Sequence, residues 1–486
     1  MIVKNSYIYI FLLVIFAMVG NGCSRNGDTG NNVTSTTDTD SITPIPTSVD
    51  YGIPNSRERF EIQKALITDK LEKALLPAMR NHGIDMWIVL DRENNYDPLQ
   101  AELAGTGAYS GVRASYIFFD NGSDVPEKIY YSSHSQPSDS VITQSYDEKI
   151  YYGYSEEGLT PHLRKLIYDK DPKKIGVNTS HTLPEADGLT VGLKNFLVDT
   201  IGPKYADRIV SAELLVRDFR LNRTELETEL YTKLLKWSAR WMEEALSTAN
   251  VVTGKTTALD IAWWLKDRAL ELGLEGGGTV RVVREGLLLP VHDPDITLQP
   301  GDIVGIDGGL DYLGFAVDIK RTAYILRPGE KMMSENLLSA WSDLHDMTDI
   351  YASNMIPGDI GHEIQSTINA KAREMGYKTV GPDSGGDAVT TTEPEVGIYG
   401  HSVGNVAHDI GARIAVDFPF AYGDRVRYPL FAGEWVSIEL HVSTPIPEWD
   451  GNTWYARLEE TAQITDEGAK FLIPTQKKLF LIEPTN

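Results

Sequence analysis

Cysteine and positive charge are both scarce in this sequence. The 486-residue chain has one cysteine, Cys23, so it cannot form an internal disulfide. Its 45 Lys and Arg stand against 69 Asp and Glu, a formal net charge of −24. Nucleic-acid binding needs Lys and Arg to neutralise phosphates, so this balance argues against a nucleic-acid partner. The length predicts two folded domains.

The sequence also has few long apolar runs, and the one near the N-terminus is short for a membrane-spanning helix. Lys4 precedes an apolar stretch from Tyr7 to Val19, and Gly22-Cys23 follows soon after. A membrane-spanning helix needs about 20 apolar residues, whereas a secretory signal has this shorter pattern. A cysteine after a small residue resembles a bacterial lipoprotein signal over residues 1–23. That resemblance implies a lipid on Cys23 and a cell-envelope location, periplasmic or at the outer membrane. An ordinary signal peptide and an uncleaved anchor are the alternatives.

The next two segments differ sharply in composition. Residues 24–50 are mostly Ser, Thr, Asp, Asn, Gly and Pro, too polar to bury a core, and predict a flexible linker. Residues 51–219 predict an α/β domain, with a helical pattern over 56–81. Short apolar runs predict its strands, at 86–90, 115–119, 128–131, 174–177 and 208–210. Its histidines are scattered singly, so this domain offers no clear chemical centre.

A second domain is predicted over residues 220–486. Thr224 and Glu227 have the spacing of a capping box that starts a long helix through Ala249. Gly276-Gly277-Gly278 predicts a turn, and no Lys-Ser/Thr follows to make it a phosphate loop. Further helices are predicted at 257–272, 336–352 and 362–375, and further strands at 279–283, 434–440 and 454–460.

The most informative stretch is 301–325, GDIVGIDGGLDYLGFAVDIKRTAYI. Two apolar runs end at Asp307 and Asp318, and glycines lie between them, which predicts a strand, a turn and a strand. Such a hairpin can place both carboxylates side by side. Carboxylates held that close repel each other unless a proton or a cation lies between them. The stretch therefore predicts a bound cation.

Three further residues on or beside predicted strands complete a ligand set. They are His401, Glu439 and Glu459. Four carboxylates and one imidazole suit hard or borderline divalent ions. Two such ions about 3.5–4 Å apart can share carboxylates and hold a hydroxide between them. We expect Mn²⁺ first, with Co²⁺, Zn²⁺ and Fe²⁺ as alternatives.

The segments GDIVGIDGGLDYLGFAVDIKRTAYI, GHSVGNVAHD, SIEL and RLEE resemble the signature segments of the pita-bread metallopeptidases. This family includes methionine aminopeptidase, Xaa-Pro aminopeptidase, prolidase and creatinase. The resemblance covers roughly residues 224–482. It implies an α+β protein with a C-terminal pita-bread domain behind a creatinase-type α/β domain, as in the aminopeptidase-P and prolidase branch. It also implies a dimer, as is frequent in that branch.

The resemblance assigns roles to single residues. Asp307, Asp318, His401, Glu439 and Glu459 match the metal ligands, and Glu439 would also shuttle a proton. His408 matches a histidine that contacts substrate or the tetrahedral intermediate, and His292 matches a second substrate-contacting histidine. The implied reaction is hydrolysis of an N-terminal Xaa-Pro peptide bond by a metal-bridging hydroxide.

Three departures from the family pattern affect the predicted substrate pocket. Gly397 stands where many relatives have a histidine, Leu440-His441 replaces the usual Pro-Gly after Glu439, and residues 418–430 resemble an insertion. Two alternatives therefore stay open: a creatinase-like hydrolase of other C–N bonds, and a catalytically silent surface binding protein.

A competing motif overlaps the predicted ligand His401. Gly400-His401-Ser402-Val403-Gly404 fits the G-x-S-x-G elbow of serine hydrolases. That elbow must follow a buried strand and open a helix, and the flanking residues favour neither. We therefore expect a metal centre rather than a serine nucleophile.

Overall fold

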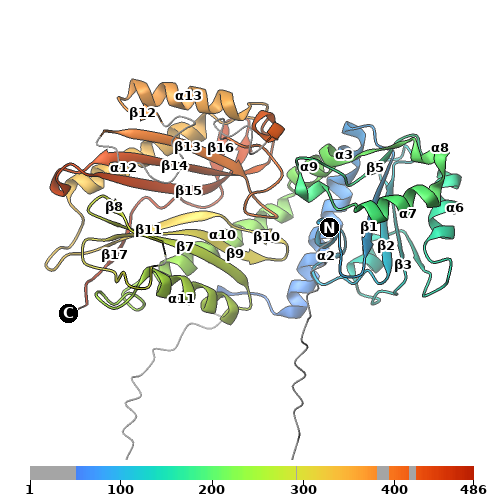
Figure 1. Cartoon of the computed structure of the whole chain (residues 1–486), viewed down its shortest axis with the longest axis horizontal. Helices are drawn as coiled ribbons and strands as arrows, with labels where there is room; N and C mark the ends of the chain where they lie inside the picture. The colour runs from blue at the N-terminus through green and yellow to red at the C-terminus, as the bar shows by residue number, and fades with distance from the viewer. Residues whose placement is uncertain (1–50, 292, 380–392, 415–422, 486) are drawn as a thin grey trace, which may run out of the picture. The chain divides into compact units, whose positions relative to one another are not determined.

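The computed structural model describes residues 51–291, 293–379, 393–414 and 423–485 (Figure 1). They belong to one compact unit, Thr47–Asn486. The predicted signal, Cys23 and the predicted linker lie outside the described residues. Among the described residues, no helix combines the length and apolar character needed to cross a membrane. The predicted domain division at 219/220 falls inside the compact unit and stays a prediction.

The first sheet is built from residues 86–211, in the strand order β4-β3-β2-β1-β5-β6. Its strands are β1 (Met86–Arg92), β2 (Arg113–Phe119), β3 (Glu127–Ser132), β4 (Glu148–Tyr151), β5 (Ile175–Val177) and β6 (Ile209–Ser211). Alternate residues of β1 enter different cores: Trp87 and Val89 pack in one, Met86 and Ile88 in the other. Both faces of this sheet are therefore covered, as expected for an α/β domain. The β4 strand was not predicted.

Helices supply these two cores. The longer ones are α2 (Ser56–Lys73), α3 (Leu75–Asn81), α6 (Thr160–Lys170), α7 (Val191–Ile201) and α9 (Glu213–Leu221). Short turns of helix are α4 (Gln100–Ala104), α5 (Val141–Ser145), η1 (Pro184–Ala186) and α8 (Pro203–Ala206). The single helix expected over 56–81 is broken at Ala74, which caps α2 and begins α3.

The remaining strands form two sheets. One has the order β17-β11-β9-β7-β8, with β10 paired to β9, and the other the order β12-β13-β14-β15-β16. The strands of the first are β7 (Glu275–Arg284), β8 (Leu287–Leu288), β9 (Ile303–Tyr312), β10 (Phe315–Ala316), β11 (Ile319–Ile325) and β17 (Phe480–Ile482). Those of the second are β12 (Lys378–Thr379), β13 (Glu395–Ser402), β14 (Trp435–Pro445), β15 (Thr453–Thr465) and β16 (Gly468–Phe471).

Helices cover one side of each of these sheets (Figure 1). α10 (Glu225–Ala245) and α11 (Ala258–Glu271) pack on β9 and β7, and α12 (Glu335–Ser353) and α13 (Gly361–Glu374) pack on β14 and β13. Short 3-10 segments are η2 (Gly423–Arg427) and η3 (Pro447–Trp449). The expected capping box of α10 is present, since Thr224 accepts from Glu227 N and Glu227 accepts from Thr224 N. These elements give the mixed α and β architecture predicted from the sequence.

The triple glycine was wrongly predicted to be a turn, because it is part of β7. Gly276, Gly277 and Gly278 pair with residues 308–310 of β9. A Cβ on Gly276 would lie 2.7 Å from the carbonyl oxygen of Gly309, and one on Gly308 would lie 2.3 Å from that of Gly277. The glycines let two backbones approach closely, which is a strand role for glycine.

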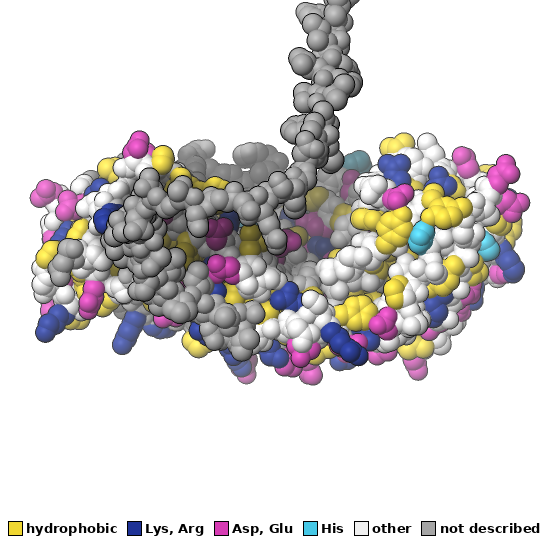
Figure 2. Space-filling view, turned by 90° about the horizontal axis from the view of Figure 1, so that it is seen from below, with side chains coloured by type: hydrophobic (Ala, Val, Ile, Leu, Met, Phe, Trp, Pro, Cys, Tyr) yellow, Lys and Arg dark blue, Asp and Glu magenta, His cyan; other side chains and the backbone are white. Residues whose placement is uncertain are grey.

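Charged side chains are mixed on the face shown in Figure 2. Among the described residues of that face, Lys and Arg are scattered between Asp and Glu. The described part of this face therefore shows no separate basic patch.

Candidate metal centre

Five strands and strand ends carry the predicted ligands. Asp307 lies on β9, Asp318 directly precedes β11, and His401, Glu439 and Glu459 lie on β13, β14 and β15. The expected hairpin is present, because β10 and β11 both pair antiparallel with β9. Glu439 and Glu459 are direct cross-strand partners, so their side chains share one face of their sheet.

The structure brings all five predicted ligands together, with His408 beside them. Their side-chain oxygen or ring-nitrogen atoms form three overlapping groups, and within each group all ligand atoms lie within 4.8 Å of one another. The groups are Asp318/His401/His408, His401/Glu439/Glu459 and Asp307/Asp318/Glu459. Residues separated by more than 150 positions thus meet where two sheets face each other.

One further residue of this cluster was missed from the sequence. The Nζ of Lys320 lies 3.1 Å from Asp307 Oδ2 and 2.7 Å from Glu439 Oε1, and it also pairs with Glu459 Oε2. Lys320 is the direct cross-strand partner of Asp307 and stands two residues after Asp318. Side chains two apart on a strand point the same way, so this spacing could have revealed it.

Burial and mutual repulsion govern the charges in the cluster. Burial raises the pKa of Asp318 well above its usual value, and Glu459 and Asp307 raise it further. Burial also raises the pKa of Asp307, against the opposing effect of the Lys320 ammonium. Burial would raise the pKa of Glu459 as well, but Lys320 and His401 hold it below its usual value.

The residues present suit a divalent cation. Four carboxylates face a single ammonium, so the cluster keeps uncompensated negative charge when its carboxylates are ionised. His401 is 2% exposed, and its Nε2 has no hydrogen-bond partner although Glu459 Oε1 lies 3.3 Å away. A buried imidazole nitrogen without a partner, beside carboxylates, is the donor chemistry of a metal ligand.

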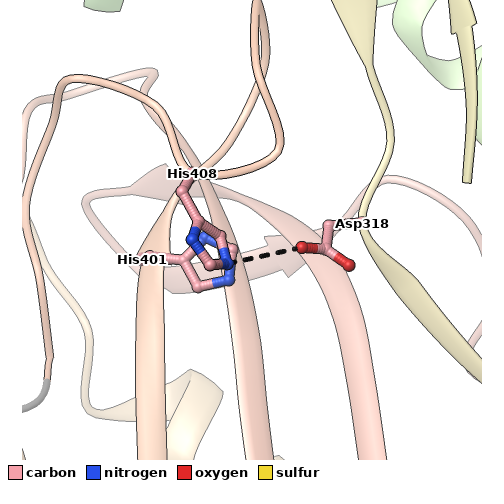
Figure 3. Close-up of side chains that lie close together, drawn as sticks. All are labelled: Asp318, His401 and His408. Atoms are coloured by element: carbon pink, nitrogen blue, oxygen red, sulfur yellow. Dashed lines mark ion pairs between the residues drawn. The ribbon is translucent and has the colours of Figure 1, made fainter. Parts of the chain in front are cut away.

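His408 lies at the open side of the cluster. Its Nε2 is 3.7 Å from Asp318 Oδ2, and its ring centroid is 4.4 Å from that of His401. Figure 3 shows both imidazoles turned toward the Asp318 carboxylate. The His408 side chain is 60% exposed, so a substrate can reach it.

A buried ion-pair network fixes the residue after His408. Asp409 is fully buried and accepts hydrogen bonds from Arg220 Nη1 at 3.0 Å and Arg223 Nη2 at 2.8 Å. Although burial opposes ionisation, these two guanidinium groups lower the pKa of Asp409 to about 2. Asp409 also accepts from Asn405 N at 2.9 Å, which holds the loop that presents His408.

The cluster opens onto a cleft of about 690 Å³. Asp307 and Asp318 line it together with the facing glycines of β7 and β9 and with Ala407 and Lys266. Because glycine has no side chain, these residues leave the cleft open beside the two carboxylates. The arrangement therefore combines a buried charged floor with access from solvent.

The predicted substrate-contacting residue His292 lies outside the described residues, so its role stays a prediction.

The competing serine-hydrolase motif can be compared with the structure at Ser402. Ser402 is the last residue of β13, is fully buried, and is followed by turns and bends rather than by a helix in the described residues up to 414. Its position does not match an exposed nucleophile on a strand-to-helix elbow.

The departures at Gly397 and His441 prove to be neighbours. The two residues are direct partners across β13 and β14. The His441 ring lies over Gly397 and packs 4.1 Å, centroid to centroid, from Tyr455. Its ring nitrogens have no hydrogen-bond partner, and burial lowers its pKa to about 3. The family pattern has a histidine at position 397, on β13. Here the imidazole next to that position belongs to His441 of the neighbouring strand, β14.

Comparison with known proteins agrees with this architecture. Residues 229–466 match the model of metallopeptidase family M24, whereas a comparison with curated proteins gave no match. The chain resembles the X-Pro aminopeptidase of Thermotoga maritima MSB8, with 20% identity, a TM-score of 0.59, and 83% of this chain and 99% of that chain covered. It also resembles the Xaa-Pro dipeptidase of Bacillus anthracis, with 18% identity, a TM-score of 0.55, and coverage of 86% and 99%.

A third similar structure is the prolidase of Pyrococcus horikoshii OT3, with 18% identity, a TM-score of 0.51, and coverage of 85% and 99%. Identities this low establish a shared fold, and the family match covers the segments that carry the five clustered ligands. Over residues 229–466, the chain belongs to metallopeptidase family M24.

Proposed function

We propose that this protein is a metallopeptidase that hydrolyses the peptide bond of N-terminal Xaa-Pro sequences. The observation that carries the proposal is the convergence of Asp307, Asp318, His401, Glu439 and Glu459 in one cluster, of which Asp307 and Asp318 line an open cleft. The names of the similar structures, X-Pro aminopeptidase, Xaa-Pro dipeptidase and prolidase, support the choice of substrate class.

The five residues would hold divalent metal; the sequence predicts two ions, with Mn²⁺ as the first choice. Bound metal would lower the pKa of a water and polarise the scissile carbonyl. Glu439 is suited to accept and return a proton, because its side chain is 26% exposed, whereas that of its cross-strand partner Glu459 is 2% exposed. His408 would donate a hydrogen bond to the oxygen of the carbonyl under attack.

The proposal can be tested by replacing one ligand. Asp318→Asn keeps the size of the side chain but removes a charge that a metal needs. We expect it to lower both metal occupancy and Xaa-Pro hydrolysis by more than about 100-fold, since even residues behind the ligands are worth 10–100-fold. Asp349→Asn, which alters an exposed carboxylate that pairs with Lys477, is the matched control.

An unchanged rate in Asp318→Asn would contradict the proposal. A panel of Xaa-Pro peptides and of non-peptide amides, run with the unaltered chain, separates the remaining possibilities. Turnover of the amides alone would favour a creatinase-like C–N hydrolase. Tight binding of peptides without turnover would favour a surface binding protein.

We also propose that Cys23 carries a lipid that anchors the protein in the cell envelope. The support is the charged, apolar and small-residue pattern of residues 1–23. Labelled fatty acid should enter the unaltered chain and not Cys23→Ser, which should become soluble; equal labelling of both would contradict the proposal. A homodimer is proposed on the family resemblance, and light scattering of the solubilised protein would measure its mass.

A further inference from the structure

The side chain of Lys320 reaches the carboxylates of the candidate metal centre. It is 6% exposed and pairs with three of the five predicted ligands, Asp307, Glu439 and Glu459. The side chain of the next residue, Arg321, points the other way and pairs with Glu460 at 3.1 Å. The strand alternation therefore directs Lys320 into the cluster.

The three contacts of Lys320 use the oxygens that a second metal ion would need. Metal–oxygen bonds are about 2.0–2.6 Å long, so an ion bound to Asp307 and Glu459 would lie close to the Lys320 ammonium. Two cations at that distance repel strongly in a buried site. The ammonium and an ion at this position therefore exclude each other.

The opposite end of the cluster makes no ion pair with Lys320. There, Asp318, His401 and His408 place one ligand atom each within 4.8 Å of one another. Figure 3 shows the two imidazoles beside each other, with the Asp318 carboxylate facing them. The unpartnered Nε2 of His401 is part of this group.

We propose that Lys320 takes the place of one metal ion, so that the chain binds a single divalent ion through Asp318, His401 and His408. This inference rests on the proposed function, because it assumes that the cluster binds metal at all. It changes the role of His408 from a substrate contact to a ligand. Two imidazoles and one carboxylate form a more nitrogen-rich set than the sequence predicted, which favours Zn²⁺, Co²⁺ or Fe²⁺ over Mn²⁺.

Metal stoichiometry tests this inference without relying on activity. The full chain, solubilised and freed of metal with a chelator, is titrated with Zn²⁺ and with Mn²⁺ in a calorimeter, and bound metal is counted by mass spectrometry. We expect one Zn²⁺ per chain, bound at least tenfold more tightly than Mn²⁺. Lys320→Ser should bind two ions, whereas Lys320→Arg, which keeps the charge, should still bind one. His408→Ala should weaken the single ion at least tenfold.

Three outcomes decide the matter. Two ions in the unaltered chain, with no change in Lys320→Ser, would overturn the inference while leaving the proposed metallopeptidase intact. One ion whose affinity is the same in His408→Ala would overturn the assignment of His408. No bound ion in the unaltered chain or in any variant would overturn both the inference and the proposed function. The count in the unaltered chain is decisive even where Lys320→Ser fails to fold.

Discussion

A methyl group on Gly397 would lie 2.0 Å from Cε1 of His441 and 2.6 Å from its Nδ1. The glycine on β13 thus leaves the space that the imidazole from β14 fills. Each of these residues departs from the expected family pattern, and the contact explains why both departures occur in the same chain.

Gly397→Ala should therefore destabilise the fold through His441. Overpacking of a buried site costs about 1–3 kcal/mol. Removing the imidazole in the double variant Gly397→Ala/His441→Ala should recover much of that loss, because the clash disappears. Unfolding in denaturant of the two single variants and the double variant measures the coupling between the positions. Additive effects would show that the two side chains do not compete for space.

Asp409→Asn should be strongly destabilising. It would leave Arg220 and Arg223 buried with a weakened partner, and breaking a buried pair costs about 3–5 kcal/mol. The measurement is the free energy of unfolding in denaturant. Asp171→Asn is the matched control, because Asp171 pairs with three basic side chains at the surface, and surface ion pairs contribute little to stability.

Equal losses in Asp409→Asn and Asp171→Asn would contradict this account of the network. A further readout concerns the loop before Asp409. Because Asp409 also holds Asn405 N, amide exchange around residues 403–409 should accelerate in Asp409→Asn and not in the control.

Asp97 should make stability fall as the pH rises toward neutrality. It is 3% exposed, and burial raises its pKa to about 7, against about 3.9 in an unfolded chain. Between these values the folded state keeps a proton that the unfolded state has lost. The free energy of unfolding therefore decreases with rising pH through this window, by at most about 1.4 kcal/mol per pH unit from this group.

Asp97→Asn should flatten that dependence, because an amide imitates the protonated acid. It also keeps an oxygen to accept from Leu99 N, as Asp97 Oδ1 does at 3.0 Å. Unfolding curves measured from about pH 5 to pH 8 give the difference between variant and unaltered chain. Parallel curves over this range would contradict the raised pKa of Asp97.

Ser402→Ala should leave peptide hydrolysis nearly unchanged. The hydroxyl is fully buried, so a substrate cannot reach it and a methyl group can take its place. The measurement is kcat/KM on an Xaa-Pro peptide. Loss of a serine nucleophile would instead reduce the rate by about a millionfold, and such a fall would favour a serine hydrolase.

Sequence reasoning located the five clustered residues because each lies beside a strand in a matched family segment. It mistook Gly276–Gly278 for a turn, since the demand for glycine comes from the facing backbone of β9, 30 to 34 residues away. It missed Lys320 for a related reason. The spacing from Asp318 directs Lys320 to the same side, but two of the carboxylates that it pairs with, Glu439 and Glu459, come from β14 and β15 and are distant in the sequence.

The central claim is that the four clustered carboxylates and His401 hold metal that the reaction requires. The most direct measurement is the rate of Xaa-Pro hydrolysis by the full chain before chelation, after chelation, and after stoichiometric return of Zn²⁺, Co²⁺ or Mn²⁺. The account predicts that chelation abolishes hydrolysis and that returned metal restores it in the unaltered chain but not in Asp318→Asn. Hydrolysis at full rate in the chelated protein would contradict it.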